Sequence, residues 1–191
     1  LVERSHQAKL DVIIDFVPNH VAREYHSTCK PRGVEDLGEN DNPQWAFSPL
    51  NNFYYMNEPF HPQFDTQDYH EEPARATGND CFTAQPSKND WYETIKLNYG
   101  VFYQGGGEQQ FDPIPSTWYK MLHILLFWSS KGVDGFRCDM AEMVPVEFWT
   151  WVIPQVKEKF PNSIFIAEVY NPQLYRDYIF RGHFDYLYDK V

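Results

Sequence analysis

Two short apolar segments, each ending on a carboxylate, constrain the fold of this chain more than any other feature. The first ends at Asp139 and the second at Glu168, 29 residues later. That spacing fits one strand–helix–strand unit. In a parallel β/α sheet, residues at the carboxyl ends of the strands meet on one rim. The sequence therefore predicts that the two carboxylates share a rim.

Hydrophobic periodicity predicts alternating strands and helices over most of the chain. In chain order we expect a helix tail at 1–9, a strand at 10–17, a helix from Ser116 to Gly132, a strand at 136–139, a helix from Pro145 to Phe160, a strand at 164–168, a helix near 172–181 and a strand at 184–188. Pro154 should kink or split its helix. The nearly continuous apolar run at 10–17 suggests a strand covered on both faces.

Residues 21–98 have a different texture, with many turn residues and little periodicity. So long a stretch predicts an irregular inserted subdomain. The flanking residues, 1–20 and 99–191, alternate strand and helix, which predicts an α/β fold with a parallel sheet. About four strands are present, and four cannot close an eight-stranded barrel. We therefore expect a partial (β/α)8 TIM barrel, cut from a larger one.

Charge and composition exclude several classes of partner. The net charge is −11, which argues against nucleic acid and against an anionic membrane surface. No apolar run reaches 18 residues, so no membrane span is expected, and no signal peptide opens the chain. The aromatic fraction of 18% is high, and such rings serve either core packing or stacking on sugars. Compartment and oligomeric state stay open.

The chain has three cysteines, and this odd number argues against a fully paired disulfide framework. Cys29 could pair with Cys81, and the sequence does not decide it. No CxxC motif is present, which argues against a cysteine-based zinc site.

The paired carboxylates suit glycosidic bond cleavage, which uses one carboxylate and one carboxylic acid. Arg137 lies two residues before Asp139, so both side chains point to the same face of a strand. A neighbouring guanidinium should lower the pKa of Asp139 and keep it ionised. Glu168 instead needs a raised pKa to donate a proton, and its sequence neighbours include no cation.

Three segments of the chain resemble sequence regions of the α-amylase family, glycoside hydrolase family 13. They are 15–20 (DFVPNH), 135–139 (GFRCD) and 166–168 (IAE), and their order and spacing match too. A long insertion follows the first region, as the family's B domain does, and residues 95–99 resemble a fourth, weaker region. The resemblance spans essentially the whole chain and implies that 21–98 is a B subdomain.

The resemblance implies a role for each matching residue. Asp139 is expected to be the nucleophile, and Glu168 the general acid and then the general base. His20 and Arg137 are expected on the substrate side of the site, with His20 hydrogen-bonding the sugar beside the cleaved bond. Asn19 is either a calcium ligand or a structural hydrogen-bonding residue. Against these roles stand structural ones: a strand-end salt bridge for Asp139 and a capping or rim carboxylate for Glu168.

The chain also departs from the family pattern. The third catalytic carboxylate lies on a later strand, so the chain as given is expected to be catalytically incomplete. Many α-amylases carry Lys-His after the nucleophile, where this chain has Glu142 and Met143. That places ordinary endo-acting starch specificity in doubt. Lys96 stands where many members have an acid, which weakens the case for calcium.

The leading interpretation is a retaining glycosidase that hydrolyses α-1,4-glucosidic bonds of an α-glucan or maltooligosaccharide. One alternative is an α-glucan transglycosylase of the same family. A second is an inactive member that serves as a carbohydrate-binding or assembly protein. A third is an unrelated β/α enzyme that shares the strand-end carboxylates by chance.

Overall fold

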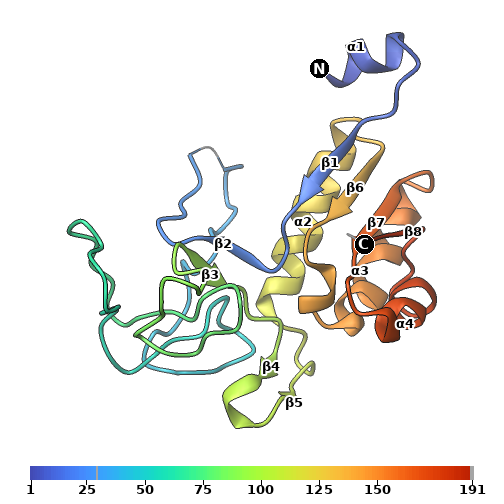
Figure 1. Ribbon diagram of the computed structural model, residues 1–191. Coiled ribbons are helices and arrows are strands. Elements are labelled where there is room, and N and C mark those ends of the chain that lie inside the picture. Colours follow the sequence, from blue (N-terminus) through green and yellow to red (C-terminus); the bar gives the residue numbers. More distant parts are fainter. Residues whose placement is uncertain (29, 190–191) are drawn as a thin grey trace. The chain divides into compact units, whose positions relative to one another are not determined.

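The computed structural model describes residues 1–28 and 30–189, which form two compact units (Figure 1). Unit 1 comprises Leu1–Asn19 and Trp118–Val191, and unit 2 comprises His20–Thr117. Cys29 lies outside the described residues, and so does its predicted pairing with Cys81. Within the described part of the chain, Cys81 and Cys138 have free thiols.

Unit 1 contains a four-stranded parallel sheet, which confirms the α/β prediction of a partial barrel sheet. Its strands lie in the order β1-β6-β7-β8. Their bounds are Ile13–Phe16 for β1, Gly135–Cys138 for β6, Ile164–Glu168 for β7 and Tyr186–Tyr188 for β8. Each crossover passes through at least one helix, as parallel neighbours require.

Alternation along the strands divides the sheet into two faces. Phe16, Phe136 and Phe165 point to one face and are at most 6% exposed. The opposite face carries Asp15 and Arg137, which are direct neighbours in the β1–β6 register. Polar side chains therefore gather on the face that lacks the phenylalanine core.

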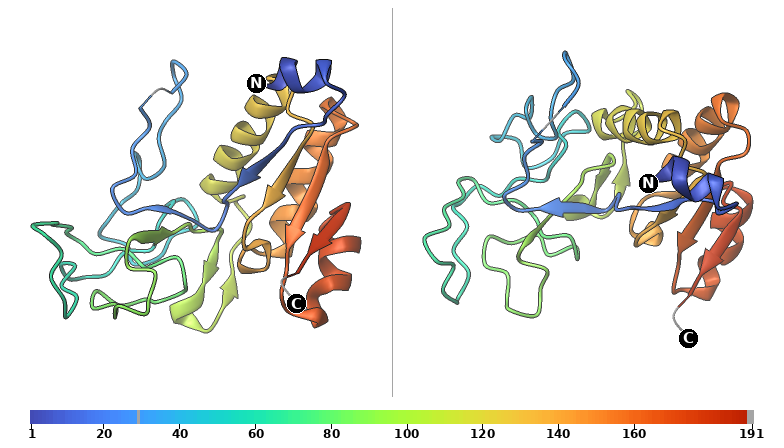
Figure 2. Two further views of the ribbon diagram at one scale, coloured as in Figure 1. Left: turned by 45° about the horizontal axis from the view of Figure 1, so that its top comes forward. Right: turned by 90° about the horizontal axis from the view of Figure 1, so that it is seen from above.

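Helices cover the phenylalanine face of the sheet, as Figure 2 shows for α2 and α3. The helices of unit 1 are α1 (Val2–Gln7), α2 (Ser116–Ser130), α3 (Val146–Lys159) and α4 (Tyr175–Phe180), with 3-10 turns η2 (Ala141–Met143) and η3 (Pro172–Leu174). Trp149 of α3 packs edge-on against Phe16, with ring centroids 6.4 Å apart. Gly132, at φ +86°, lies just past the end of α2 in a conformation that favours glycine.

Two expectations about these elements are corrected. Pro154 does not split its helix, because α3 is continuous over Val146–Lys159. Val152, Ile153 and Val156 flank Pro154 and are fully buried, and this packing offsets the hydrogen bond that proline removes. The strand predicted at 10–17 is not covered on both faces, since Ile13 is still 37% exposed.

Unit 2 is largely irregular, as its sequence predicts. It contains two small antiparallel pairs, β2 (His20–Ala22) with β3 (Thr94–Lys96) and β4 (Val101–Phe102) with β5 (Glu108–Gln109), and a 3-10 turn η1 (Tyr103–Gly105). Its core consists of Tyr54, Met56, Phe60, Ala74, Ala76 and Ala84.

The boundary between the units differs from the predicted domain boundary. Residues 99–117, assigned to the barrel from sequence, cluster with unit 2. Hydrogen bonds explain this: the Tyr54 hydroxyl donates to the Val101 carbonyl at 2.8 Å, and the Ser116 N–H donates to the Pro49 carbonyl at 3.2 Å. The helix signal at Ser116, where regular structure resumes, lies within two residues of the change of unit, which falls between Thr117 and Trp118.

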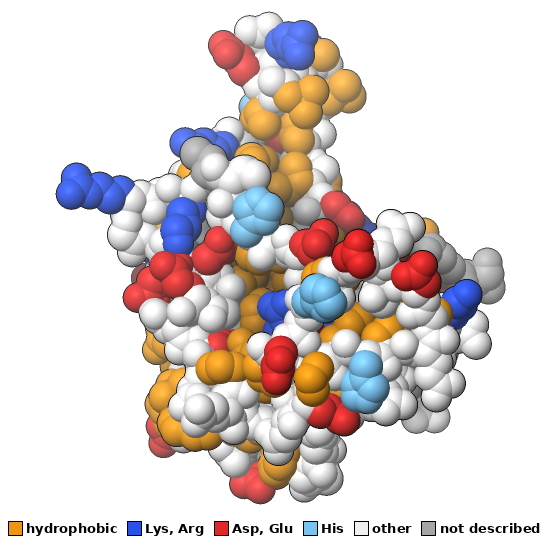
Figure 3. Space-filling model, turned by 90° about the vertical axis from the view of Figure 1, so that its left-hand side faces the viewer, with side chains coloured by type: hydrophobic (Ala, Val, Ile, Leu, Met, Phe, Trp, Pro, Cys, Tyr) orange, Lys and Arg blue, Asp and Glu red, His pale blue; other side chains and the backbone are white. Residues whose placement is uncertain are grey.

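Acidic side chains are spread over the surface that Figure 3 shows, in keeping with the net charge of −11. Across the described residues, the structure contains no helix with the length and apolar character needed to cross a membrane.

Candidate active site

One guanidinium gathers three carboxylates at the carboxyl end of the sheet in unit 1. Arg137 Nη1 donates to Asp139 Oδ1 at 2.7 Å and to Asp15 Oδ1 at 3.0 Å. Arg137 Nη2 lies 2.8 Å from Glu168 Oε2. Asp139 and Glu168 thus share Arg137 as a common partner. The structure thus brings Arg137, Asp139 and Glu168 together on one rim.

Glu168 is held by donors on both carboxylate oxygens. Its Oε2 accepts the backbone N–H of Met140 at 3.0 Å, besides the contact with Arg137. Its Oε1 accepts the Tyr170 hydroxyl. The residue is only 1% exposed, so these donors take the place of water around a buried carboxylate.

The pKa directions are opposite to those expected from sequence. Burial raises the pKa of Asp139, and the negative charge of Glu168 raises it further, against the Arg137 guanidinium. Burial alone would also raise the pKa of Glu168, but the hydrogen bonds from Tyr170 and Met140, with the Arg137 charge, outweigh it and lower that pKa. The structure therefore favours the ionised form of Glu168 more than that of Asp139.

Glu168 has a cation beside it in space, although its sequence neighbours include none. Arg137 lies opposite Ile166 in the β6–β7 register, two residues before Glu168 on the neighbouring strand. Residues that are adjacent across strands are far apart in sequence, so inspection of Ala167 and Val169 could not reveal this partner.

Asn19 and His20, the other predicted site residues, lie on either side of the boundary between the two units. Asn19 is fully buried at the end of the first segment of unit 1. His20 belongs to unit 2, where it begins β2 and meets the Trp91 ring edge-on at a centroid distance of 5.4 Å. Gly78 is required beside it, because a Cβ there would lie 2.8 Å from the His20 Cβ. The proposed contact of His20 with substrate stays a prediction.

The donor set gives calcium little support. Calcium needs six to eight oxygen ligands, and within the described residues no group of three or more His, Cys, Asp or Glu side chains is arranged to hold a metal. Lys96 is 1% exposed and its ammonium lies 2.6 Å from Asp80 Oδ1. A carboxylate of unit 2 is thus already paired with a fixed cation. Calcium at Asn19 remains a prediction.

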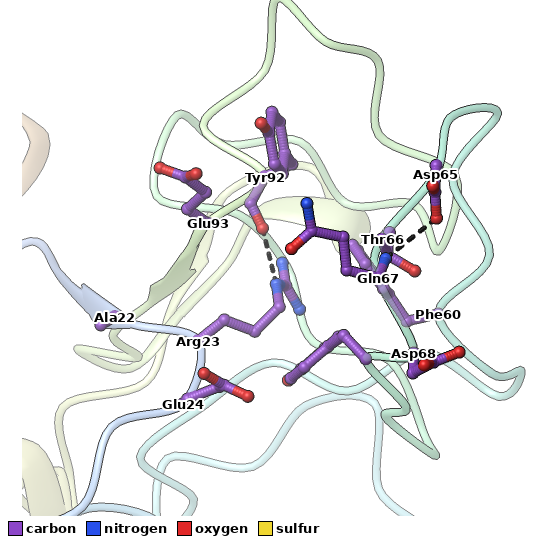
Figure 4. Close-up of a pocket in the computed structure, with 11 residues that line it drawn as sticks. Ala22, Arg23, Glu24, Phe60, Asp65, Thr66, Gln67, Asp68, Tyr92 and Glu93 are labelled. Carbon is purple, nitrogen blue, oxygen red and sulfur yellow. Dashed lines mark hydrogen bonds between the residues drawn. The ribbon is translucent and has the colours of Figure 1, made fainter.

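A pocket of about 570 Å³ lies within unit 2 and contains none of the predicted site residues (Figure 4). Arg23 reaches into it, with its Nε donating to the Tyr92 carbonyl at 2.7 Å. The same guanidinium is bound to Glu71 at 2.5 Å and lies 4.3 Å from the centre of the Phe60 ring. These contacts give the Arg23 guanidinium a structural role, in which it holds the surrounding loops together.

Comparison with known proteins identifies the family of this chain. The family model described as "Alpha amylase, catalytic domain" matches residues 1–175. The chain belongs to the α-amylase family. The four-stranded parallel sheet is accordingly part of a (β/α)8 barrel, and the resemblance noted in the sequence is confirmed.

Relatives and solved structures extend the comparison. An α-1,4-glucan:maltose-1-phosphate maltosyltransferase of Cereibacter sphaeroides is 35% identical over 96 residues, covering 50% of this chain and 14% of that protein. The same-named protein of Rhodospirillum rubrum is 42% identical over 53 residues, covering 28% of this chain and 8% of that protein. This chain therefore spans only a small part of those relatives.

Two solved structures share the fold. A debranching enzyme of Nostoc punctiforme superposes with a TM-score of 0.63 at 18% identity, covering 97% of this chain and 31% of that one. An α-amylase of Geobacillus thermoleovorans complexed with acarbose gives 0.55 at 20% identity, covering 97% and 32%. The chain thus spans about a third of these enzymes.

Sequence reasoning missed three groups at the rim: the Tyr170 hydroxyl, the Met140 N–H and the Glu142 carboxylate. Met140 adopts a left-handed conformation at φ +46°, which few non-glycine residues do and which no local sequence signal announces. Tyr170 lies two residues after Glu168, so the alternation of side chains could have placed it near that carboxylate.

Proposed function

We propose that this chain carries the nucleophile and the general acid/base of a retaining α-glucan-active enzyme. The observation that carries the proposal is the joint binding of Asp139 and Glu168 to Arg137 on one rim, because retaining enzymes need two closely spaced carboxyl groups, ~5–5.5 Å apart. Family membership supports an α-glucan or maltooligosaccharide as substrate.

In the proposed reaction, Asp139 attacks the anomeric carbon while Glu168 protonates the departing oxygen. Glu168 then takes a proton from the acceptor, whose oxygen displaces Asp139. Attack requires Asp139 ionised and Glu168 protonated. The pKa shifts of the free site run against both requirements, so the reactive form is not the one that the free site favours.

Transfer to a sugar acceptor is a second candidate, and two observations favour it. Relatives that match this chain are named maltosyltransferases and name maltose-1-phosphate as a substrate. In addition, Arg137, Met140 and Tyr170 stabilise Glu168 as a carboxylate, the form that removes a proton from an acceptor hydroxyl. A phosphate leaving group needs little protonation, so an ionised Glu168 suits a glycosyl phosphate donor.

The experiment uses the full-length protein and its Asp139→Asn variant with maltoheptaose and, separately, with maltose-1-phosphate plus maltooligosaccharide. Hydrolysis increases the number of reducing ends, whereas transfer yields longer chains without that increase. We expect Asp139→Asn to lose at least a thousandfold in either reaction, since a nucleophile acts as a unit with its acid/base.

Wild-type turnover by a folded Asp139→Asn protein would refute the assignment of Asp139. Binding of maltoheptaose by the wild-type protein in titration calorimetry, with no turnover of either donor, would instead support the inactive carbohydrate-binding alternative.

A further inference from the structure

The turn that follows Asp139 makes hydrogen bonds to the end of β7 and to the loop after it. Its first contact is the Met140 N–H on Glu168 Oε2. Its second is Glu142, in η2, whose Oε2 accepts the N–H of Tyr170 at 3.1 Å and the N–H of Asn171 at 3.0 Å. A single carboxylate oxygen thus binds two successive backbone donors of the loop after β7.

Tyr170 is held from both sides by these contacts. Its backbone is bound by Glu142, and its hydroxyl donates to Glu168 Oε1. The loop beyond it is fixed as well, because the Asn171 side chain accepts the Gln173 N–H at 3.0 Å at the start of η3. Rotation of the loop would break the Glu142 contacts and remove the hydroxyl from Glu168.

Other charged or titratable groups also face Glu168, and each has a separate origin. Arg137 and Asp139 approach from β6 and the residue after it, and Tyr188 of β8 is the register neighbour of Glu168. Asp15 of β1 shares the Arg137 guanidinium with Glu168. Only the Tyr170 hydroxyl depends on the Glu142 contact, so that effect can be separated from the rest.

We propose that Glu142 and Tyr170 are positioning residues: Glu142 fixes the loop after β7, and through that loop Tyr170 orients the Glu168 carboxylate. The proposal rests on the function proposed for Glu168. This role explains why an acid at position 142 is compatible with an active site, because the Glu142 carboxylate is hydrogen-bonded to backbone N–H groups.

The test separates orientation by Glu142 from its simple charge effect. Loss of the Tyr170 hydroxyl removes a donor to the ionised form, so Tyr170→Phe should move the titration of Glu168 to higher pH. Glu142→Leu should move it in the same direction by releasing Tyr170. Glu142→Gln keeps an acceptor oxygen for the two N–H groups and should leave the titration unchanged. A charge effect predicts the opposite sign, because removing a nearby negative charge lowers a carboxyl pKa.

The titration is read by carboxyl carbon NMR of the full-length protein labelled at glutamate, with the Glu168 signal identified by its loss in Glu168→Gln. This readout is independent of turnover, so it stands even if no α-glucan is processed. In an active protein, the basic limb of the pH–rate profile should move with the NMR titration. Tyr175→Phe is the matched control, since that hydroxyl donates to Asp189, and it should leave both readouts unchanged.

The proposal predicts equal shifts for Tyr170→Phe, Glu142→Leu and their double variant, because both changes remove the same donor. An unchanged Glu168 titration in Tyr170→Phe would overturn it. Equal responses of Glu142→Gln and Glu142→Leu would also overturn it, because they would show that charge and not the acceptor oxygen matters.

Discussion

Asp139 is a carboxylate placed where its charge is costly. It shares the Arg137 guanidinium with Glu168, and its side chain is 23% exposed while that of Glu168 is 2% exposed. Two like charges this close cannot both ionise easily. Arg137 binds both and reduces the repulsion, yet the pKa of Asp139 is still raised. The structure therefore makes ionisation of the proposed nucleophile less favourable than in water.

This strain predicts that Asp139→Asn stabilises the folded protein. For a carboxyl whose folded pKa is raised, the cost of ionisation is absent below the unfolded value of 3.8 and grows as pH rises through the folded value. The amide removes that cost. Thermal unfolding should therefore give a higher midpoint for Asp139→Asn than for wild type at pH 7, with the difference shrinking toward pH 3.

The pH dependence is the decisive part of that measurement. A midpoint difference of constant size from pH 3 to pH 7 would point to a packing effect and contradict the electrostatic explanation.

Individual residues also show where sequence reasoning reaches its limit. Asp139, Glu168 and Arg137 could be found because each ends or precedes a strand end in a matching motif. The proton balance between Asp139 and Glu168 could not, since it depends on Met140, Tyr170 and the cross-strand position of Arg137. Those contacts arise from register and from one left-handed residue, and neither leaves a clear trace in the sequence.

At the scale of elements, the strands and helices of unit 1 are well predicted, and the exceptions are instructive. β7 has the predicted bounds because an apolar run between turn residues fits a buried strand. α3 passes through Pro154 because packing on both sides overrides local propensity. In unit 2, turn residues predict irregularity but not which loops pair, and the predicted domain boundary after residue 98 differs from the change of unit after Thr117.

One element of unit 2 depends on a buried ion pair. Lys96 of β3 is almost fully buried against Asp80, which is 38% exposed at its side chain. Asp80→Asn removes the negative charge that pairs with the Lys96 ammonium. Burial lowers the pKa of Lys96 and Asp80 counteracts that shift, so the variant leaves a buried ammonium without its counter-charge. We expect a loss of roughly 1–3 kcal/mol in the free energy of unfolding, measured by urea denaturation.

Asp65→Asn is the matched control for that change. Asp65 Oδ1 accepts the N–H of the nearby Gln67 at 3.0 Å, and asparagine keeps an acceptor there. Its effect should be within about 0.5 kcal/mol. Equal losses in the two variants would show that the ion pair does not hold β3.

At the scale of the whole molecule, the chain supplies four parallel strands of an α-amylase barrel together with a compact irregular insert. It covers about a third of the solved enzymes that share its fold. The order of the elements could be predicted from the sequence because the hydrophobic periodicity and the turn residues indicate the same strands, helices and loops. The choice between hydrolysis and transfer was not, because both reactions use the same two carboxyl groups and differ in the acceptor.

The central claim is that Asp139 forms a covalent bond to the sugar. Incubation of the full-length protein with a fluorinated α-glucosyl fluoride, whose glycosyl-enzyme breaks down slowly, should trap that bond. Peptide mass spectrometry is predicted to find the added sugar on the peptide containing Asp139, and to find none after Asp139→Asn. Label on a different carboxylate, or turnover of the reagent by the Asp139→Asn protein, would contradict the account.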